Sequence, residues 1–167
     1  MTYAARPATH NLRPPDAFAL QSVKFISEQL LLACPFFSPT NRADDISLPH
    51  PARLPLGAAW RGTCTVPGHE TTELGASELE HCNLGYAHAC PRFPKERPAD
   101  AVRFVVSKQS PERIVLQYVL EMNHLPVAHG SLEYDCEQSG WKTQHPEPRI
   151  QTLADCYLRS YLERNRA

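Results

Sequence analysis

Alternating apolar and polar positions in the second half of the chain predict a β-sheet. Three segments, residues 101–108, 113–123 and 127–135, are rich in β-branched and aromatic residues, and two short turn-forming segments separate them. Each segment is long enough for one strand, and each turn is short enough for a hairpin. The pattern therefore predicts a three-stranded antiparallel β-meander over about residues 101–135.

One register sorts the side chains of this meander onto two contrasting faces. It pairs Phe104 with Leu116 in the first hairpin. In the second hairpin it pairs Tyr118 with Leu132. A slip of one residue would move every side chain to the other face, so the sorting supports the meander. The apolar face then collects Val102, Phe104, Val106, Ile114, Leu116, Tyr118, Leu120, Met122, Ala128, Leu132 and Tyr134.

Two amphipathic segments can cover the apolar face of the meander. Residues 16–34 begin with Asp16, a favourable N-cap, and carry apolar side chains at helical spacing until Pro35 ends the helix. Residues 149–164 carry a second apolar stripe at the C-terminus. Helices packed on one face of an antiparallel sheet form an α+β domain.

The length of 167 residues fits one domain with irregular additions. Residues 1–15 contain little apolar periodicity and are predicted to form a mobile tail. Residues 16–167 are predicted to form a single α+β domain. Within it, residues 35–98 form an irregular cysteine-containing region, and residues 99–165 form the meander and the C-terminal helix.

The irregular region is defined by turn-forming residues and few apolar ones. Residues 35–55 contain five prolines and no sustained period, which predicts a loop on the surface. A short helix is predicted from Ser77, which can form a capping box with Glu80. That helix would carry Cys82.

Composition and charge restrict the cellular compartment and the classes of partner that we expect. The net charge of −1 gives no basic field for phosphates, which argues against nucleic acid. The sequence contains no apolar run of the length that a signal peptide or a membrane span needs, so we expect a cytoplasmic protein with no membrane partner. Thiols stay reduced in the cytosol, so six cysteines favour metal ligation or burial over disulfides.

Four cysteines, Cys34, Cys64, Cys82 and Cys90, lie in or next to the region that has the fewest apolar residues. Thiolates gathered from a loop can supply the folding free energy that the loop lacks by binding a metal. The spacing, C-x29-C-x17-C-x7-C-P, differs from the close-set pairs of common zinc sites. The four cysteines are nevertheless predicted to bind one inorganic centre.

Three interpretations of these cysteines remain open at this point. Four thiolates suit an iron–sulfur cluster, of the 4Fe–4S type, or a zinc ion. A mixed zinc site can use His69 in place of Cys34, which is then merely buried. Without a metal, the cysteines are small apolar side chains of a core. In an unbroken helix Cys82 and Cys90 would lie roughly 12 Å apart, so shared ligation requires that helix to break.

The sequence predicts a small iron–sulfur protein that acts in electron transfer, redox sensing or as an accessory subunit with a protein partner. The alternatives are a zinc-stapled protein–protein interaction module and a metal-free binding protein. No catalytic residues are assigned: Glu121, placed across from His129 by the register above, is interpreted as a cross-strand ion pair. Cys136 and Cys156 are expected to be buried outside the site.

Overall fold

The computed structural model describes residues 32–48, 54–70, 73–85 and 90–166. Over this part of the chain the protein is α+β, with two antiparallel sheets and two helices. In chain order these elements are β1 (Phe37–Arg42), β2 (Trp60–Cys64), α1 (Ala76–Leu84), β3 (Ala101–Gln109), β4 (Arg113–Met122), β5 (Leu125–Asp135), β6 (Gly140–Thr143) and α2 (Pro148–Arg164).

The larger sheet is a meander of four strands in the order β3-β4-β5-β6, so the prediction of three strands was wrong. The fourth strand is only four residues long and pairs with the end of β5, where Tyr134 lies opposite Trp141. The rings of these two residues form an edge-to-face contact at 5.4 Å. A strand this short carries too few residues for an alternating pattern to reveal it.

The register of the meander differs from the predicted one by two residues in each hairpin. Phe104 pairs with Tyr118, and Leu116 pairs with Leu132. Because the shift is even, each side chain stays on its predicted face. A bulge after Val106 in β3 changes the register by one further residue between Lys108 and the turn.

The second hairpin closes through a two-residue turn at Asn123 and His124, both of which adopt positive φ angles of 49° and 64°. This turn lets β5 begin at Leu125, two residues earlier than predicted. His129 therefore pairs with Val119, and the predicted pairing of His129 with Glu121 was wrong. Glu121 is buried and forms an ion pair with Arg103.

The smaller sheet is a hairpin of β1 and β2, and β1 lies within the segment predicted to be a loop. The prediction of a loop was wrong because it treated every proline as a loop signal, whereas Pro39 lies in β1 at a register shift of the hairpin. Proline is tolerated at bulges and at the edge of a sheet, where its missing N–H breaks no ladder hydrogen bond.

The predicted tail, residues 1–15, and residues 16–31 of the predicted first helix lie outside the described residues. The predicted end of this helix at Cys34 was wrong, because the chain is already extended at Ala33. Ala33 forms a bridge with Val102 through two backbone hydrogen bonds of 2.8 and 3.0 Å. This bridge ties the segment before β1 to the edge of the larger sheet.

Both described helices were predicted, with different starting points. Helix α2 begins at Pro148, one residue before the predicted start, because proline is favourable in the first turn. Helix α1 begins after Gly75, whose N–H donates to Glu78 Oε2 at 2.9 Å. The predicted capping box of Ser77 and Glu80 was therefore wrong by two residues.

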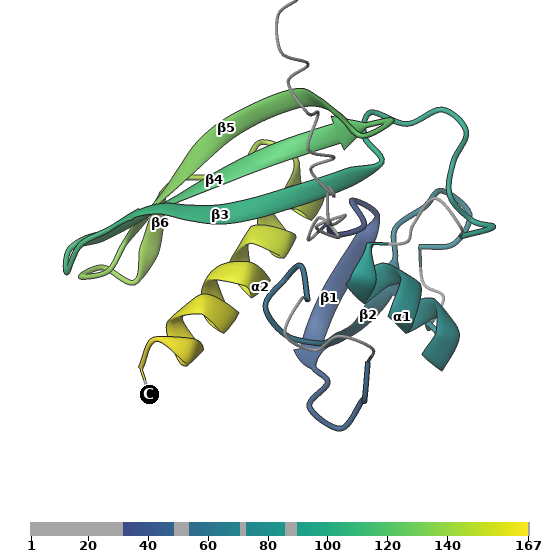
Figure 1. Cartoon of the computed structure of the whole chain (residues 1–167), viewed down its shortest axis with the longest axis horizontal. Coiled ribbons are helices and arrows are strands. Elements are labelled where there is room, and N and C mark those ends of the chain that lie inside the picture. The colour runs from purple at the N-terminus through teal and green to yellow at the C-terminus, as the bar shows by residue number, and fades with distance from the viewer. Residues whose placement is uncertain (1–31, 49–53, 71–72, 86–89, 167) are drawn as a thin grey trace, which may run out of the picture.

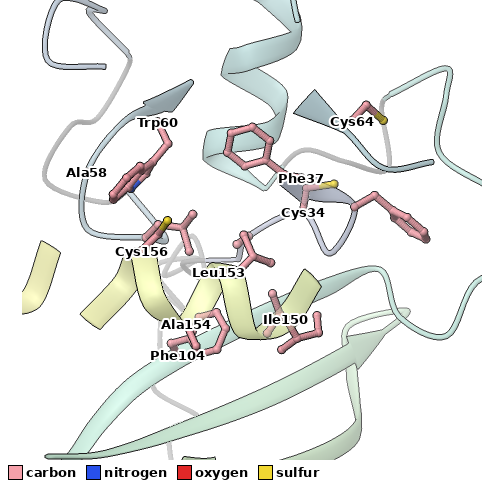
Figure 2. Packing of buried hydrophobic residues seen from close by; sticks show 14 of the residues in the cluster. Cys34, Phe37, Ala58, Trp60, Cys64, Phe104, Ile150, Leu153, Ala154 and Cys156 are labelled. Atoms are coloured by element: carbon pink, nitrogen blue, oxygen red, sulfur yellow. The ribbon is translucent and has the colours of Figure 1, made fainter. Parts of the chain in front are cut away.

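Helix α2 packs against both sheets and forms the centre of the core. It crosses beneath the four-stranded sheet, and β1 stands beside it (Figure 1). Figure 2 shows its residues Leu153 and Ala154 with Phe37 and Trp60 above the helix and Phe104 below it. The C-terminal helix thus covers one face of the sheet as predicted, and the hairpin β1–β2 covers the other side of the helix.

Candidate metal centre

The four predicted ligands come from four separate pieces of backbone. Cys34 follows the Ala33 bridge and begins the turn into β1, where its carbonyl accepts the Phe37 N–H at 3.1 Å. Cys64 is the last residue of β2, and Cys82 lies in the last turn of α1. Cys90 begins a turn. Cys34 and Cys64 are buried, and Cys82 and Cys90 are half-buried.

These four thiols lie close enough to influence one another. Cys34 and Cys82 are hydrogen-bonded to each other. A negative charge on Cys64 raises the pKa of Cys82. Negative charges on Cys34 and Cys90 raise the pKa of Cys64. The structure therefore places Cys34, Cys64 and Cys90 within electrostatic reach of Cys82, although 29, 17 and 7 residues separate the four cysteines along the chain.

The pKa of Cys34 lies below its ordinary value, mainly because the Cys82 thiol donates a hydrogen bond to its sulfur. Backbone N–H groups of Phe36 and Phe37 also point to this sulfur, and Arg149 adds a positive charge, while burial opposes these effects. The same hydrogen bond, followed by burial and by the charges of the other thiols, raises the pKa of Cys82. Cys34 is thus the thiol of this pair that its surroundings favour as a thiolate.

Burial raises the pKa of Cys64, and the charges on Cys34 and Cys90 raise it further. Two groups oppose this effect: the backbone N–H of Val66, which is hydrogen-bonded to the Cys64 sulfur, and the guanidinium of Arg92. Cys34 and Cys64 therefore share one local motif, in which the N–H two residues later points at the sulfur. Such N–H groups stabilise a thiolate that binds a metal.

Short polar contacts hold the cysteine-bearing segments together. Thr65, next to Cys64, donates its backbone N–H and its hydroxyl to the carbonyl of Phe36 at 2.8 and 2.9 Å. Gly85, next to the Cys82 helix, approaches Leu32 so closely that an added Cβ would lie 1.8 Å from the Leu32 carbonyl oxygen. The segments that carry Cys34, Cys64 and Cys82 are thus fixed to one another by contacts outside the thiols.

Two arginines adjoin the quartet that Cys34, Cys64, Cys82 and Cys90 form. Arg149, from the first turn of α2, helps to lower the pKa of Cys34, and its guanidinium lies 4.9 Å from the centre of the Phe36 ring. Arg92, two residues after Cys90, opposes the rise in the pKa of Cys64 and forms an ion pair with Glu78. Sequence reasoning missed both arginines. The only available signal was that Arg92 follows the Cys90-Pro91 step.

Within the described ranges, no three His, Cys, Asp or Glu side chains converge tightly enough to hold a single metal ion. All four cysteines of the quartet lie within these ranges, so they form no ready-made tetrahedral zinc site in this structure. His69, the alternative ligand, is not among the main groups that act on Cys34, Cys64 or Cys82. Ligation of a metal by the quartet stays a prediction.

The remaining two cysteines lie apart from the quartet. Cys156 is buried on α2, where burial raises its pKa to about 12 and its charged neighbours are Asp155 and Arg159. Cys136 is half-buried after β5, and the charged groups that act on it are Asp135 and Glu112. Burial was thus the right expectation for Cys156 and half right for Cys136.

Comparison of the chain with protein-family models, with curated proteins and with solved structures found no match. Across the described part of the chain, neither helix has the length and the apolar character needed to cross a membrane. What can be inferred about function therefore depends on the quartet and its surroundings.

Proposed function

We propose that the protein binds a 4Fe–4S cluster through Cys34, Cys64, Cys82 and Cys90 and acts in electron transfer, redox sensing or as an accessory subunit. The observation that carries this proposal is that Cys34, Cys64 and Cys90, from distant segments of the chain, lie within electrostatic reach of Cys82. The cytoplasm is the proposed compartment, because cysteines that form no disulfide are typical of a reducing environment.

Four cysteine ligands with no obligatory imidazole suit an iron–sulfur cluster as well as a zinc ion. A zinc ion draws four sulfurs to one point, whereas a cluster holds each thiolate on a different iron and so spreads the sulfurs apart. The described residues contain contacts between the thiols but no three donors at the spacing of a single ion. We propose an iron–sulfur cluster, with zinc as the alternative that the experiment below distinguishes.

The surroundings of the quartet also fit a cluster. Four thiolates give the centre a negative charge, and Arg149 and Arg92 place positive charges beside Cys34 and Cys64. Backbone N–H groups at the sulfurs of Cys34 and Cys64 are of the kind that adjust the reduction potential of a cluster. When bound, the cluster would supply one-electron chemistry that the side chains alone do not have.

A protein partner is proposed because the quartet is buried on one side only. Cys34 and Cys64 face the core, where Phe36 and Phe93 form an edge-to-face pair at 5.7 Å. Cys82 and Cys90 are half-buried and lie nearer the surface. A partner that exchanges electrons with the centre would therefore approach from the side of Cys82 and Cys90.

The test is an absorption spectrum and a metal analysis of the full chain purified without oxygen. A cluster gives a brown protein with broad absorption in the visible range that bleaches when dithionite is added. A colourless protein with one zinc per chain would replace the proposal with the zinc-stapled module. A colourless protein without metal, whose thermal midpoint is the same with and without a chelator, would leave a metal-free binding protein.

A further inference from the structure

The end of helix α1 and the segment that precedes β1 are in direct backbone contact. Gly85, the C-cap of α1, approaches Leu32 so closely that an added Cβ would lie 1.8 Å from the Leu32 carbonyl oxygen. Cys82 lies three residues before Gly85, and Cys34 lies two residues after Leu32. Positions three apart at the end of a helix lie on the same side of it. The helix therefore turns Cys82 toward the segment that carries Cys34.

The sulfur atoms of these two cysteines meet at this contact. The thiol of Cys82 donates a hydrogen bond to the sulfur of Cys34. Both side chains belong to one packed group, because Cys34 is part of the core cluster and Cys82 packs against that cluster. Both are free thiols. The atom between the two sulfurs is thus the hydrogen that oxidation to a disulfide removes.

The fold holds the two sulfurs together without a covalent bond. Ala33, directly before Cys34, is fixed to the edge of the larger sheet by its bridge with Val102. Leu79, one turn before Cys82, is buried in the core cluster and fixes the other side of the pair. A disulfide requires β-carbons roughly 3.5–4.5 Å apart, so it forms readily only between cysteines that the fold already keeps in contact.

We propose that Cys34 and Cys82 form a site of reversible oxidation, at which a hydroperoxide converts the two thiols of the reduced chain to an intramolecular disulfide. One sulfur attacks the hydroperoxide, the O–O bond breaks, and that sulfur becomes a sulfenic acid. The second thiol then forms the S–S bond and displaces the hydroxyl group as water. With hydrogen peroxide, two thiols and one peroxide give one disulfide and two water molecules. Two electrons pass from the sulfurs to the peroxide.

The disulfide would tie α1 to the segment before β1 and close the loop from residue 34 to residue 82. A link across a long loop restricts the unfolded chain and so stabilises the folded one. Disulfides of cytosolic proteins are usually transient and serve catalysis or redox sensing. The inference needs only the contact between the two thiols and does not rest on the proposed function, although the disulfide would remove two of the proposed ligands.

The experiment treats the reduced full chain with hydrogen peroxide, blocks the remaining thiols by alkylation and maps the cross-links by mass spectrometry. Iron, sulfide and zinc are measured first, and any metal is removed with a chelator, because a metal would occupy the same thiols. Cleavage after Arg61, Glu80 and Tyr86 places each cysteine of the quartet on a peptide of its own. The same treatment of the chain unfolded in urea shows whether the fold selects the pair.

The wild type is expected to lose two of its six thiols and to give one cross-link, between the peptides of Cys34 and Cys82. Dithiothreitol should restore all six, because thiol exchange reverses the step. The oxidised chain should have a higher thermal midpoint than the reduced chain. Cys82→Ser is expected to lose the cross-link. The matched control is Cys64→Ser, which should keep it, because Cys64 and Cys34 are equally buried at 6% exposure.

A wild type that keeps six thiols, or that links Cys82 to Cys64 or Cys90 instead, overturns the inference. An equal yield of the Cys34–Cys82 cross-link in the unfolded chain also overturns it, because the fold would then not select the pair. These results come from the wild type and so do not depend on whether a serine variant folds. The metal content tests the proposed function separately, so the two proposals can fail independently.

Discussion

The side chain of Asn83 hydrogen-bonds to both backbone groups of Trp60. Its Oδ1 accepts the Trp60 N–H at 2.8 Å, and its Nδ2 donates to the Trp60 carbonyl at 2.9 Å. The same Nδ2 donates to the carbonyl of Leu79 at 2.8 Å. Asn83 therefore acts on β2 as a neighbouring strand would, and it fixes α1, with Cys82, to the strand that ends at Cys64.

Replacing Asn83 by Leu is expected to destabilise the fold. Asn83 is 3% exposed, so the substitution leaves the N–H and the carbonyl of Trp60 buried without partners. Each unsatisfied group costs about 1–3 kcal/mol. Denaturant unfolding measures this loss. The matched control is Asn41→Leu on the exposed face of β1, and an equal loss in the two variants would show that Asn83 does not link α1 to β2.

Replacing Gly85 by Ala is expected to separate α1 from the segment before Cys34. Gly85 ends α1 with a φ of 72°, and an added Cβ would collide with the Leu32 carbonyl. Gly68→Ala is a matched control, because Gly68 has a φ of 83° but open space around it. The left-handed conformation alone costs roughly 1–2 kcal/mol.

The thermal midpoints of the two glycine variants therefore differ, with Gly85→Ala the lower. Loss of the proposed metal centre is expected in Gly85→Ala but not in Gly68→Ala. Equal midpoints and equal metal contents would mean that the close approach of Gly85 to Leu32 is not required.

Asp135 is expected to make the meander sensitive to acid. The N–H of Gln138 and the ammonium of Lys142 hold the pKa of Asp135 below its ordinary value. A carboxylate with a lowered folded-state pKa adds stability above its unfolded pKa of about 3.9. That stability is lost as the pH falls through the lower folded-state pKa.

Asp135→Asn should therefore lower the thermal midpoint at pH 7 and flatten its dependence on pH below about 4. Thermal unfolding followed by circular dichroism from pH 7 to pH 2 checks this. Glu96→Gln, at an exposed position, is the control and should keep the wild-type profile. A profile for Asp135→Asn that is as steep as that of the wild type contradicts the assignment.

Leu153 lies at the centre of the core, and its truncation measures how much α2 contributes to the fold. The side chain is fully buried on α2, in the cluster that also contains residues of both sheets. Leu153→Ala should cost about 2–5 kcal/mol, because it creates a cavity that the neighbours fill only in part. Leu125→Ala should change the free energy of unfolding by no more than about 0.5 kcal/mol, because Leu125 is 67% exposed. Denaturant unfolding of both variants makes the comparison.

Local patterns predicted α2 and the faces of the meander because those elements depend on periodicity along the chain. The exact register depended on the turn at Asn123 and His124, where both residues adopt a conformation that glycine usually supplies. The hairpin β1–β2 was missed because prolines are common in loops, and Pro39 is accommodated at an irregular position. Both errors concern a turn or a bulge, and the spacing of apolar residues along the chain gives no information about either.

The candidate cysteines could be chosen from the sequence, but their positions in the fold could not. Cysteine content and the lack of apolar residues singled out the quartet. The positions of these cysteines depend on tertiary contacts, among them the Ala33–Val102 bridge and the Thr65–Phe36 hydrogen bonds, which no local pattern encodes. Arg149 comes from the C-terminal helix, so only the folded chain places it beside Cys34.

The most direct measurement is the iron and acid-labile sulfide content per chain, in anaerobically purified wild type and in single cysteine-to-serine variants. The account predicts four irons and four sulfides per wild-type chain, and a loss of both in the Cys64→Ser and Cys82→Ser variants. Cys136→Ser should keep the wild-type content, because Cys136 lies outside the quartet. Iron and sulfide at background levels in the wild type, or a content that Cys64→Ser leaves unchanged, would contradict the account.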